Sequence, residues 1–133
     1  MVRFFVFQGS FEIMQNRQQL RQTISDKRKT NPIEKQAQCA LDLLEQIKNF
    51  SLFNQSKNIA FYMAAFGEID PNPILQLALK QNKNCYLPTV ESATNKELHF
   101  VKYQNSDLLI KNRYSILEPQ FAKDKVLPTS ELD

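Results

Sequence analysis

Two parts of the chain place apolar residues at the spacing of a helix. In residues 33–50 they recur at three- and four-residue intervals, which is typical of an amphipathic helix. The apolar positions of this segment are Ile33, Ala37, Ala40, Leu41, Leu44 and Ile47. Residues 17–29 are basic, carry a weaker apolar stripe at Leu20 and Ile24, and predict another helix. Pro32 separates the two, because a proline disfavours helical angles in the residue before it.

Continuous apolar runs predict the strands. Residues 58–64 have the length and composition of a central strand that is covered on both faces. Residues 70–81 open with Asp-Pro, an N-cap residue followed by a favoured first helical residue, and predict a helix. Short strands are expected at residues 85–88 and 98–103, whereas residues 105–119 carry too few turn signals to assign. Strand, helix, strand is a βαβ unit with parallel strands, so we predict an α/β fold with a largely parallel sheet and flanking helices.

Composition narrows the class of protein. A chain of 133 residues with 42% apolar and 23% charged residues is typical of one globular domain, and a net charge of +3 does not call for nucleic acid. Cys39 and Cys85 form no C-x-x-C pair and sit in apolar contexts, which predicts reduced, buried thiols in a cytoplasmic protein. No apolar run approaches the roughly 20 residues that span a bilayer.

The two ends of the sequence differ from its middle in their pattern of apolar and polar residues. The apolar run in residues 4–7 is too short for a secretory signal, so we interpret residues 1–13 as an extension with no role in the fold. After the strand predicted at 98–103, about thirty mostly irregular residues follow, and a sheet of this kind normally has more strands to cover its edges. The pattern predicts that the chain is part of a longer domain.

Two features are candidates for chemistry. Arg17, Arg21 and Arg28 fall within about 40° of one another on a helical wheel, an arrangement that suits phosphate but more often marks a solvated face. Nucleic-acid binding is disfavoured because no aromatic residues interleave these charges. In the turn at residues 66–70, Glu68 would project from the rim where a strand meets a helix, the usual place for a ligand in open parallel sheets. The residues alone do not decide between a ligand contact and a solvated side chain.

Other chemistry has weaker support. Met63 is by default a core residue, and His99 stands alone, with no cysteine or carboxylate at ligand spacing. The sequence contains no Ser-His-Asp order, no Walker glycine loop and no paired-cysteine metal site.

An ordered set of segments resembles one family. RQQLRQTISDKRK, IAFYMAAFGEIDPNPIL, KNCYLPTV, LHFVKY, NRYSILEP and VLPTSELD follow one another as they do in the 5-formyltetrahydrofolate cyclo-ligases, also called methenyltetrahydrofolate synthetases. The resemblance runs from about residue 16 to residue 133. We therefore predict that residues 14–133 are the N-terminal portion of a single α/β cyclo-ligase domain.

The resemblance implies an activity and a set of site residues. Members of the family use Mg²⁺ and ATP to convert 5-formyltetrahydrofolate to 5,10-methenyltetrahydrofolate, releasing ADP and phosphate. Their basic-x-x-Leu-Arg motif, which contacts ATP, falls on Arg17, Gln18, Gln19, Leu20 and Arg21; its first position is usually lysine, so Arg17 is a departure. Folate contacts fall on Met63 and Glu68. The resemblance assigns no catalytic or metal-binding residue to this portion.

The resemblance also implies a missing part. Family members continue past the position of Asp133 into another strand and a glycine-rich segment that contacts ATP, Mg²⁺ and folate. We therefore expect this chain to be inactive alone, because the backbone donors for phosphate are absent. A separately encoded C-terminal segment is a candidate partner. The alternative is a non-catalytic remnant or subunit that binds folate or nucleotide, and neither reading involves nucleic acid or a membrane.

Overall fold

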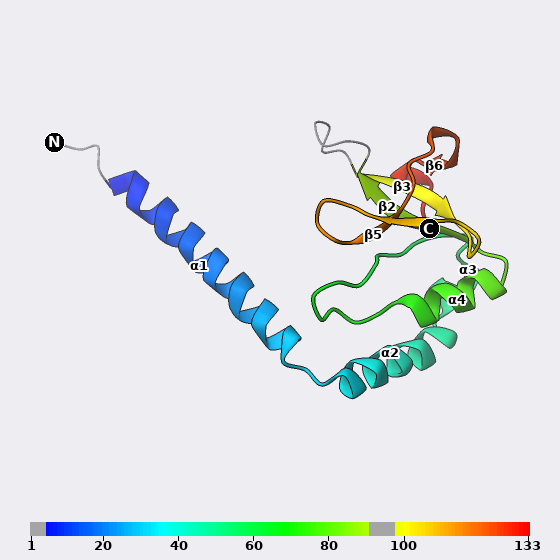
Figure 1. Cartoon of the computed structure of the whole chain (residues 1–133), viewed down its shortest axis with the longest axis horizontal. Coiled ribbons are helices and arrows are strands. Elements are labelled where there is room, and N and C mark those ends of the chain that lie inside the picture. Colours follow the sequence, from blue (N-terminus) through cyan, green and yellow to red (C-terminus); the bar gives the residue numbers. More distant parts are fainter. Residues whose placement is uncertain (1–4, 91–97) are drawn as a thin grey trace.

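The computed structural model describes residues 5–90 and 98–133. The helices are α1 (Phe5–Lys29), α2 (Ile33–Lys48), α3 (Ser51–Gln55) and α4 (Asn72–Lys80), with short 3₁₀ turns at Lys123–Lys125 and Thr129–Glu131. The strands are β1 (Asn58–Ala60), β2 (Asn84–Val90), β3 (Leu98–Tyr103), β4 (Leu109–Lys111), β5 (Leu117–Pro119) and β6 (Val126–Leu127). Helix α1 projects away from the rest of the molecule (Figure 1).

The strands form a four-stranded sheet in the order β1-β2-β3-β6 and a separate β4-β5 hairpin. Strands β1 and β2 are parallel, which confirms the predicted βαβ unit with α4 as its helix. The other pairings are antiparallel. The α/β class is confirmed, but the described sheet is mixed rather than largely parallel. The connection between β2 and β3 spans only residues 91–97, whereas a parallel crossover needs about a dozen residues or more.

The first predicted strand is shorter than its apolar run and lies at an edge of the described sheet. Strand β1 ends at Ala60, although the Phe61 amide still donates to the carbonyl of Tyr86 at 2.9 Å. Beyond Ala60 the residues are apolar because they pack in the core, not because they belong to a strand. The Phe61 side chain is buried in the core and Met63 packs against the core, while the backbone turns away from the sheet.

The core lies between the sheet and two stacked helices. Helix α4 packs on β2, and α2 packs on the other side of α4 (Figure 1). The buried residues of this core come from α3, α4, β2, β3 and the segment after β1, and partly buried residues of α2 pack against them. The buried members are Phe53, Phe61, Ile74, Leu75, Ala78, Cys85, Leu87 and Tyr103. The helices predicted at 33–50 and 70–81 are therefore confirmed in their place as well as their type.

The helix predicted at 17–29 lies within α1, which begins earlier, at Phe5. Residues 1–4 of the proposed extension lie outside the described residues. Both cysteines are free thiols, but only Cys85 is buried, so the prediction is wrong for half-buried Cys39. Within residues 5–90 and 98–133, no helix is long and apolar enough to cross a bilayer.

Candidate functional site

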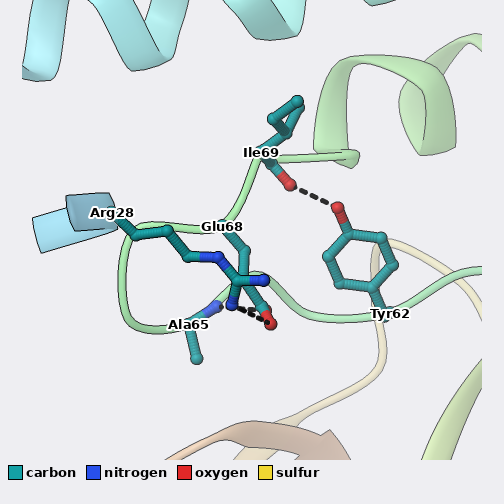
Figure 2. A network of polar contacts seen from close by, with 5 residues as sticks. All are labelled: Arg28, Tyr62, Ala65, Glu68 and Ile69. Carbon is teal, nitrogen blue, oxygen red and sulfur yellow. Dashed lines mark hydrogen bonds and ion pairs between the residues drawn. The ribbon is translucent and has the colours of Figure 1, made fainter. Parts of the chain in front are cut away.

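The segment after β1 forms a tight turn that is braced by its own glutamate. Phe66 and Gly67 adopt positive φ angles of 52° and 79°, which reverse the chain. The Glu68 amide donates to the Ala65 carbonyl at 3.1 Å, and one oxygen of the Glu68 carboxylate accepts the Ala65 amide at 3.2 Å (Figure 2). The side chain of Glu68 therefore folds back over the turn and is held in a defined direction.

Arg28, near the end of α1, contacts the other oxygen of this carboxylate. Its Nη1 atom lies 3.7 Å from Glu68 Oε1, and both side chains are partly exposed (Figure 2). An exposed ion pair of this length contributes little to stability, at most about 1 kcal/mol. Its main consequence is geometric, since it gives the two Glu68 oxygens different partners and places a cation beside the turn.

Gly67 allows the end of α1 to touch the turn directly. A Cβ atom at this position would lie 2.7 Å from the Arg28 carbonyl oxygen and 3.1 Å from the Arg28 Cβ. Contacts below 3 Å to a backbone atom cannot be relieved by turning a side chain. Gly67 is therefore required for two reasons, its positive φ and this close approach.

Tyr62 closes the turn from the opposite side. Its hydroxyl donates to the Ile69 carbonyl at 2.6 Å (Figure 2). Partial burial raises the pKa of this hydroxyl above its ordinary value, and the carboxylates of Glu68 and Asp70 raise it further, while Arg28 opposes them. The hydroxyl thus stays protonated and remains a donor well above neutral pH.

Removal of this hydroxyl tests how firmly the turn is held. Tyr62→Phe should lower the free energy of unfolding by about 0.5–1 kcal/mol, because it removes one neutral hydrogen bond at a half-exposed position. Urea unfolding at pH 7 measures the change. Tyr114→Phe, at an exposed tyrosine between β4 and β5, is the control. Equal effects of the two substitutions would show that the Tyr62 bond does not hold the turn.

Asp70 begins the next helix, although one residue earlier than a standard cap. Its Oδ1 atom accepts the Asn72 amide at 2.9 Å, and α4 begins at Asn72 with Pro71 in the N-cap position. The predicted start of the helix is thus confirmed to within one residue. Asp70 therefore accepts a hydrogen bond at the start of α4, whereas Glu68 accepts one within the turn.

Among the described residues, the turn and the start of α2 enclose a small cavity. Its volume is about 50 Å³, and its walls include Lys35, Gln36 and Cys39 of α2 together with Gly67 and Glu68. Ligand pockets for molecules of cofactor size measure roughly 300–1,000 Å³, so this hollow holds at most part of a ligand. Nothing in the sequence singles out Lys35 or Gln36, because their local pattern does not differ from that of a solvated helix face.

The other predicted site residues are not gathered at this turn. Arg17, Gln18, Gln19, Leu20 and Arg21 are all exposed on α1. At a rise of 1.5 Å per residue they lie about 10–17 Å along the helix axis from Arg28. Arg17 and Arg21 do share the helical face of Arg28, which meets the turn. Met63 is half-buried and packs against the core.

The chain is similar to known proteins over almost its whole length. A model of the 5-formyltetrahydrofolate cyclo-ligase family matches residues 13–133. A 5-formyltetrahydrofolate cyclo-ligase of Haemophilus influenzae is 34% identical over 119 residues, which cover 90% of this chain and 64% of that protein. The corresponding protein of Escherichia coli K12 is 26% identical over 110 residues, covering 83% of this chain and 60% of the relative.

A solved structure shows the same fold. The NMR structure of Aquifex aeolicus 5,10-methenyltetrahydrofolate synthetase superimposes with a TM-score of 0.73 at 24% identity, over 87% of this chain and 57% of that one. The chain thus spans about 60–64% of the length of the curated relatives that it matches. Because the family model covers the helix α1 motif, the Glu68 turn and every described strand, the chain belongs to the 5-formyltetrahydrofolate cyclo-ligase family.

Proposed function

We propose that this chain supplies the N-terminal part of an ATP-dependent 5-formyltetrahydrofolate cyclo-ligase, with the turn around Glu68 as its folate contact. The observation that carries the proposal is the match of the family model over residues 13–133. The fixed direction of the Glu68 carboxylate supports it, because a preoriented acceptor binds a ligand donor with little loss of side-chain entropy. A cytoplasmic location belongs to the same proposal.

The proposed reaction has two steps. The formyl oxygen of 5-formyltetrahydrofolate attacks the γ-phosphorus of ATP, and ADP leaves. The second folate nitrogen then attacks the activated carbon and loses its proton, and the C–O bond breaks as phosphate departs. The product is the cyclic 5,10-methenyl cation. A formamide carbonyl needs this activation because its oxygen is otherwise a poor leaving group.

The residues of this chain would bind and orient rather than react. Arg17 and Arg21 are exposed guanidinium groups on one face of α1, and such groups suit the phosphates of ATP. Gln18, Gln19 and Leu20 complete the proposed nucleotide motif, and Met63 would border the folate. Among the described residues no cluster of three or more His, Cys, Asp or Glu side chains is found, so no residue here is assigned to Mg²⁺.

Glu68→Gln tests the folate contact. The substitution should weaken the binding of 5-formyltetrahydrofolate about tenfold, because hydrogen bonds to a charged group contribute roughly 1.5–3 kcal/mol. The free energy of unfolding should change by less than about 1 kcal/mol, since the ion pair with Arg28 is partly exposed. NMR titration of the 133-residue chain measures the affinity. Glu45→Gln, which removes a similar surface pair with Lys48, is the control. Unchanged affinity in Glu68→Gln would exclude Glu68 as a ligand contact.

A turnover assay distinguishes a part of an active cyclo-ligase from a non-catalytic subunit that binds folate or nucleotide. The small volume of the cavity at the turn favours a chain that binds part of its ligands and works only with a partner. We expect no formation of methenyltetrahydrofolate by this chain alone, and turnover when the part that the relatives carry outside the matched region is added. Turnover by the isolated chain would overturn the need for a partner. Binding without turnover under either condition would favour a non-catalytic subunit.

A further inference from the structure

The turn at residues 65–68 has the φ pattern of a type I′ turn. The Glu68 amide donates to the Ala65 carbonyl at 3.1 Å, and the two central residues, Phe66 and Gly67, have positive φ angles of 52° and 79°. Turns of this type favour asparagine, aspartate or glycine at the first central position, because a larger side chain is strained at positive φ. A phenylalanine at this position therefore costs stability that an asparagine would not.

The other left-handed positions follow the usual preference for short polar side chains. Besides Phe66, the non-glycine residues with positive φ among the described residues are Asn82 and Ser115, with angles of 57° and 61°. Asparagine is one of the residues that tolerate this conformation best after glycine. Within residues 5–90 and 98–133, Phe66 is thus the only bulky side chain on a left-handed backbone.

Packing in the core does not offset the strain at Phe66. Its side chain is 59% exposed, whereas Phe61, five residues earlier, is 8% exposed and belongs to the core. Other groups hold the turn, since the Glu68 carboxylate accepts the Ala65 amide at 3.2 Å and the end of α1 approaches Gly67 closely. The fold therefore fixes the backbone of Phe66 with little use of its side chain. Backbone strain of this kind is concentrated at functional sites and ligand clamps.

We propose that Phe66 is a specificity-determining residue of the folate site, where its ring stacks on the flat pyrimidine ring of 5-formyltetrahydrofolate. Phe66 lies two residues before Glu68 in the same turn. The amino group and the ring N–H of the pyrimidine lie in the plane of that ring. A carboxylate at the edge of the ring and an aromatic side chain against its face therefore bind it together. The inference rests on the proposed function, since it takes Glu68 as the folate contact.

Three substitutions of Phe66 separate a ligand contact from a structural role. Phe66→Asn supplies the residue that the turn favours, so it should raise the midpoint of urea unfolding by roughly 0.3 M. The same substitution should weaken the binding of 5-formyltetrahydrofolate by about three- to tenfold, because the stacking contact is lost. Phe66→Leu keeps a bulky side chain at positive φ, so it should weaken binding with little change in the midpoint. Phe66→Tyr should keep both properties.

NMR titration of the 133-residue chain with 5-formyltetrahydrofolate measures the affinities. Phe50→Asn, at a phenylalanine that is 50% exposed and has a negative φ of −84°, is the control and should leave the affinity unchanged. Nuclear Overhauser contacts should join the Phe66 ring protons to the C7 protons of the pterin, which belong to the fused ring next to the pyrimidine. Contacts to the protons of the aminobenzoyl ring instead would overturn the assignment to the pyrimidine.

The inference and the proposed function fail in different ways. If the unsubstituted chain binds 5-formyltetrahydrofolate and Phe66→Asn binds it equally well, the stacking role is overturned and the Glu68 contact stands. If the unsubstituted chain does not bind it, the Glu68 contact is overturned and the stacking role falls with it. A lower midpoint in Phe66→Asn would show that the fold depends on the phenylalanine side chain, and would also overturn the inference.

Discussion

Gly67→Ala is expected to lower the free energy of unfolding by about 1–3 kcal/mol and to detach the end of α1 from the turn. Part of the loss is the left-handed backbone, which disfavours any residue with a Cβ by about 1 kcal/mol or more. The rest comes from the contact of 2.7 Å that the new Cβ would make with the Arg28 carbonyl oxygen. That oxygen already accepts the Asn31 amide at 3.3 Å, so it has little freedom to retreat.

A matched control separates these two causes. Asn82 also has a positive φ, 57°, at the end of α4, so the difference between Asn82→Gly and Asn82→Ala measures the backbone term at a second left-handed position. Urea unfolding of the three variants gives the free energies. Amide exchange of Asn31, whose partner is the Arg28 carbonyl, reports on the contact with α1. If Gly67→Ala loses no more stability than separates Asn82→Ala from Asn82→Gly, the close approach to Arg28 contributes nothing.

Stability is expected to fall by about 2–3 kcal/mol between roughly pH 9 and pH 11 because of Cys85. Burial raises the pKa of the Cys85 thiol from 9.0 to about 11, and Lys83 opposes this only in part. The folded chain therefore keeps the proton in a range where the unfolded chain has lost it. A raised pKa in the folded state means that the stabilisation is complete below about pH 9 and is lost as the pH rises toward 11.

The variant Cys85→Ala isolates this contribution. Tyr62 and Tyr86 also have raised pKa values and add a pH dependence of the same sign, so only the difference between the two proteins assigns the effect. Unfolding free energies at several values from pH 8 to pH 11 should converge as the pH rises. Parallel curves would show that Cys85 does not titrate differently in the folded chain. At pH 8 a thiol reagent should modify half-buried Cys39 well before Cys85.

Several elements were predictable because their signals are local. The spacing of apolar residues predicted α2, the Asp-Pro pair predicted the start of α4, and short β-type runs predicted β2 and β3. The hairpin of β4 and β5 was missed, although it has a local cause. The side chain of Asn112 accepts the amides of Tyr114 and Ile116 at 2.9 and 3.1 Å, and Ser115 has a φ of 61°. An asparagine that starts a turn is a recognisable signal, but an isolated one is weak.

The candidate site was predictable only in part, because its residues acquire their meaning from contacts distant in sequence. The order of motifs indicated the family and singled out Glu68. Nothing in the sequence indicated that Arg28 would reach this carboxylate, or that Gly67 would touch the Arg28 backbone. Both contacts join segments about forty residues apart. The periodicity of apolar residues predicts local elements and does not predict which distant segments will meet. The roles of Arg17, Arg21 and Met63 remain predictions.

By itself the sequence determined the α/β class and the βαβ unit, since these depend on residue types at short, regular spacing. It indicated the family through the resemblance of its ordered segments. Only the tertiary structure decided the direction of β3, the early end of β1 and the positions of Glu68 and Asp133. Those outcomes depend on which backbone groups find partners across the fold. A short connection forces β3 antiparallel, and the carboxylate of Asp133 accepts the amide of Asn58, 75 residues away in the sequence.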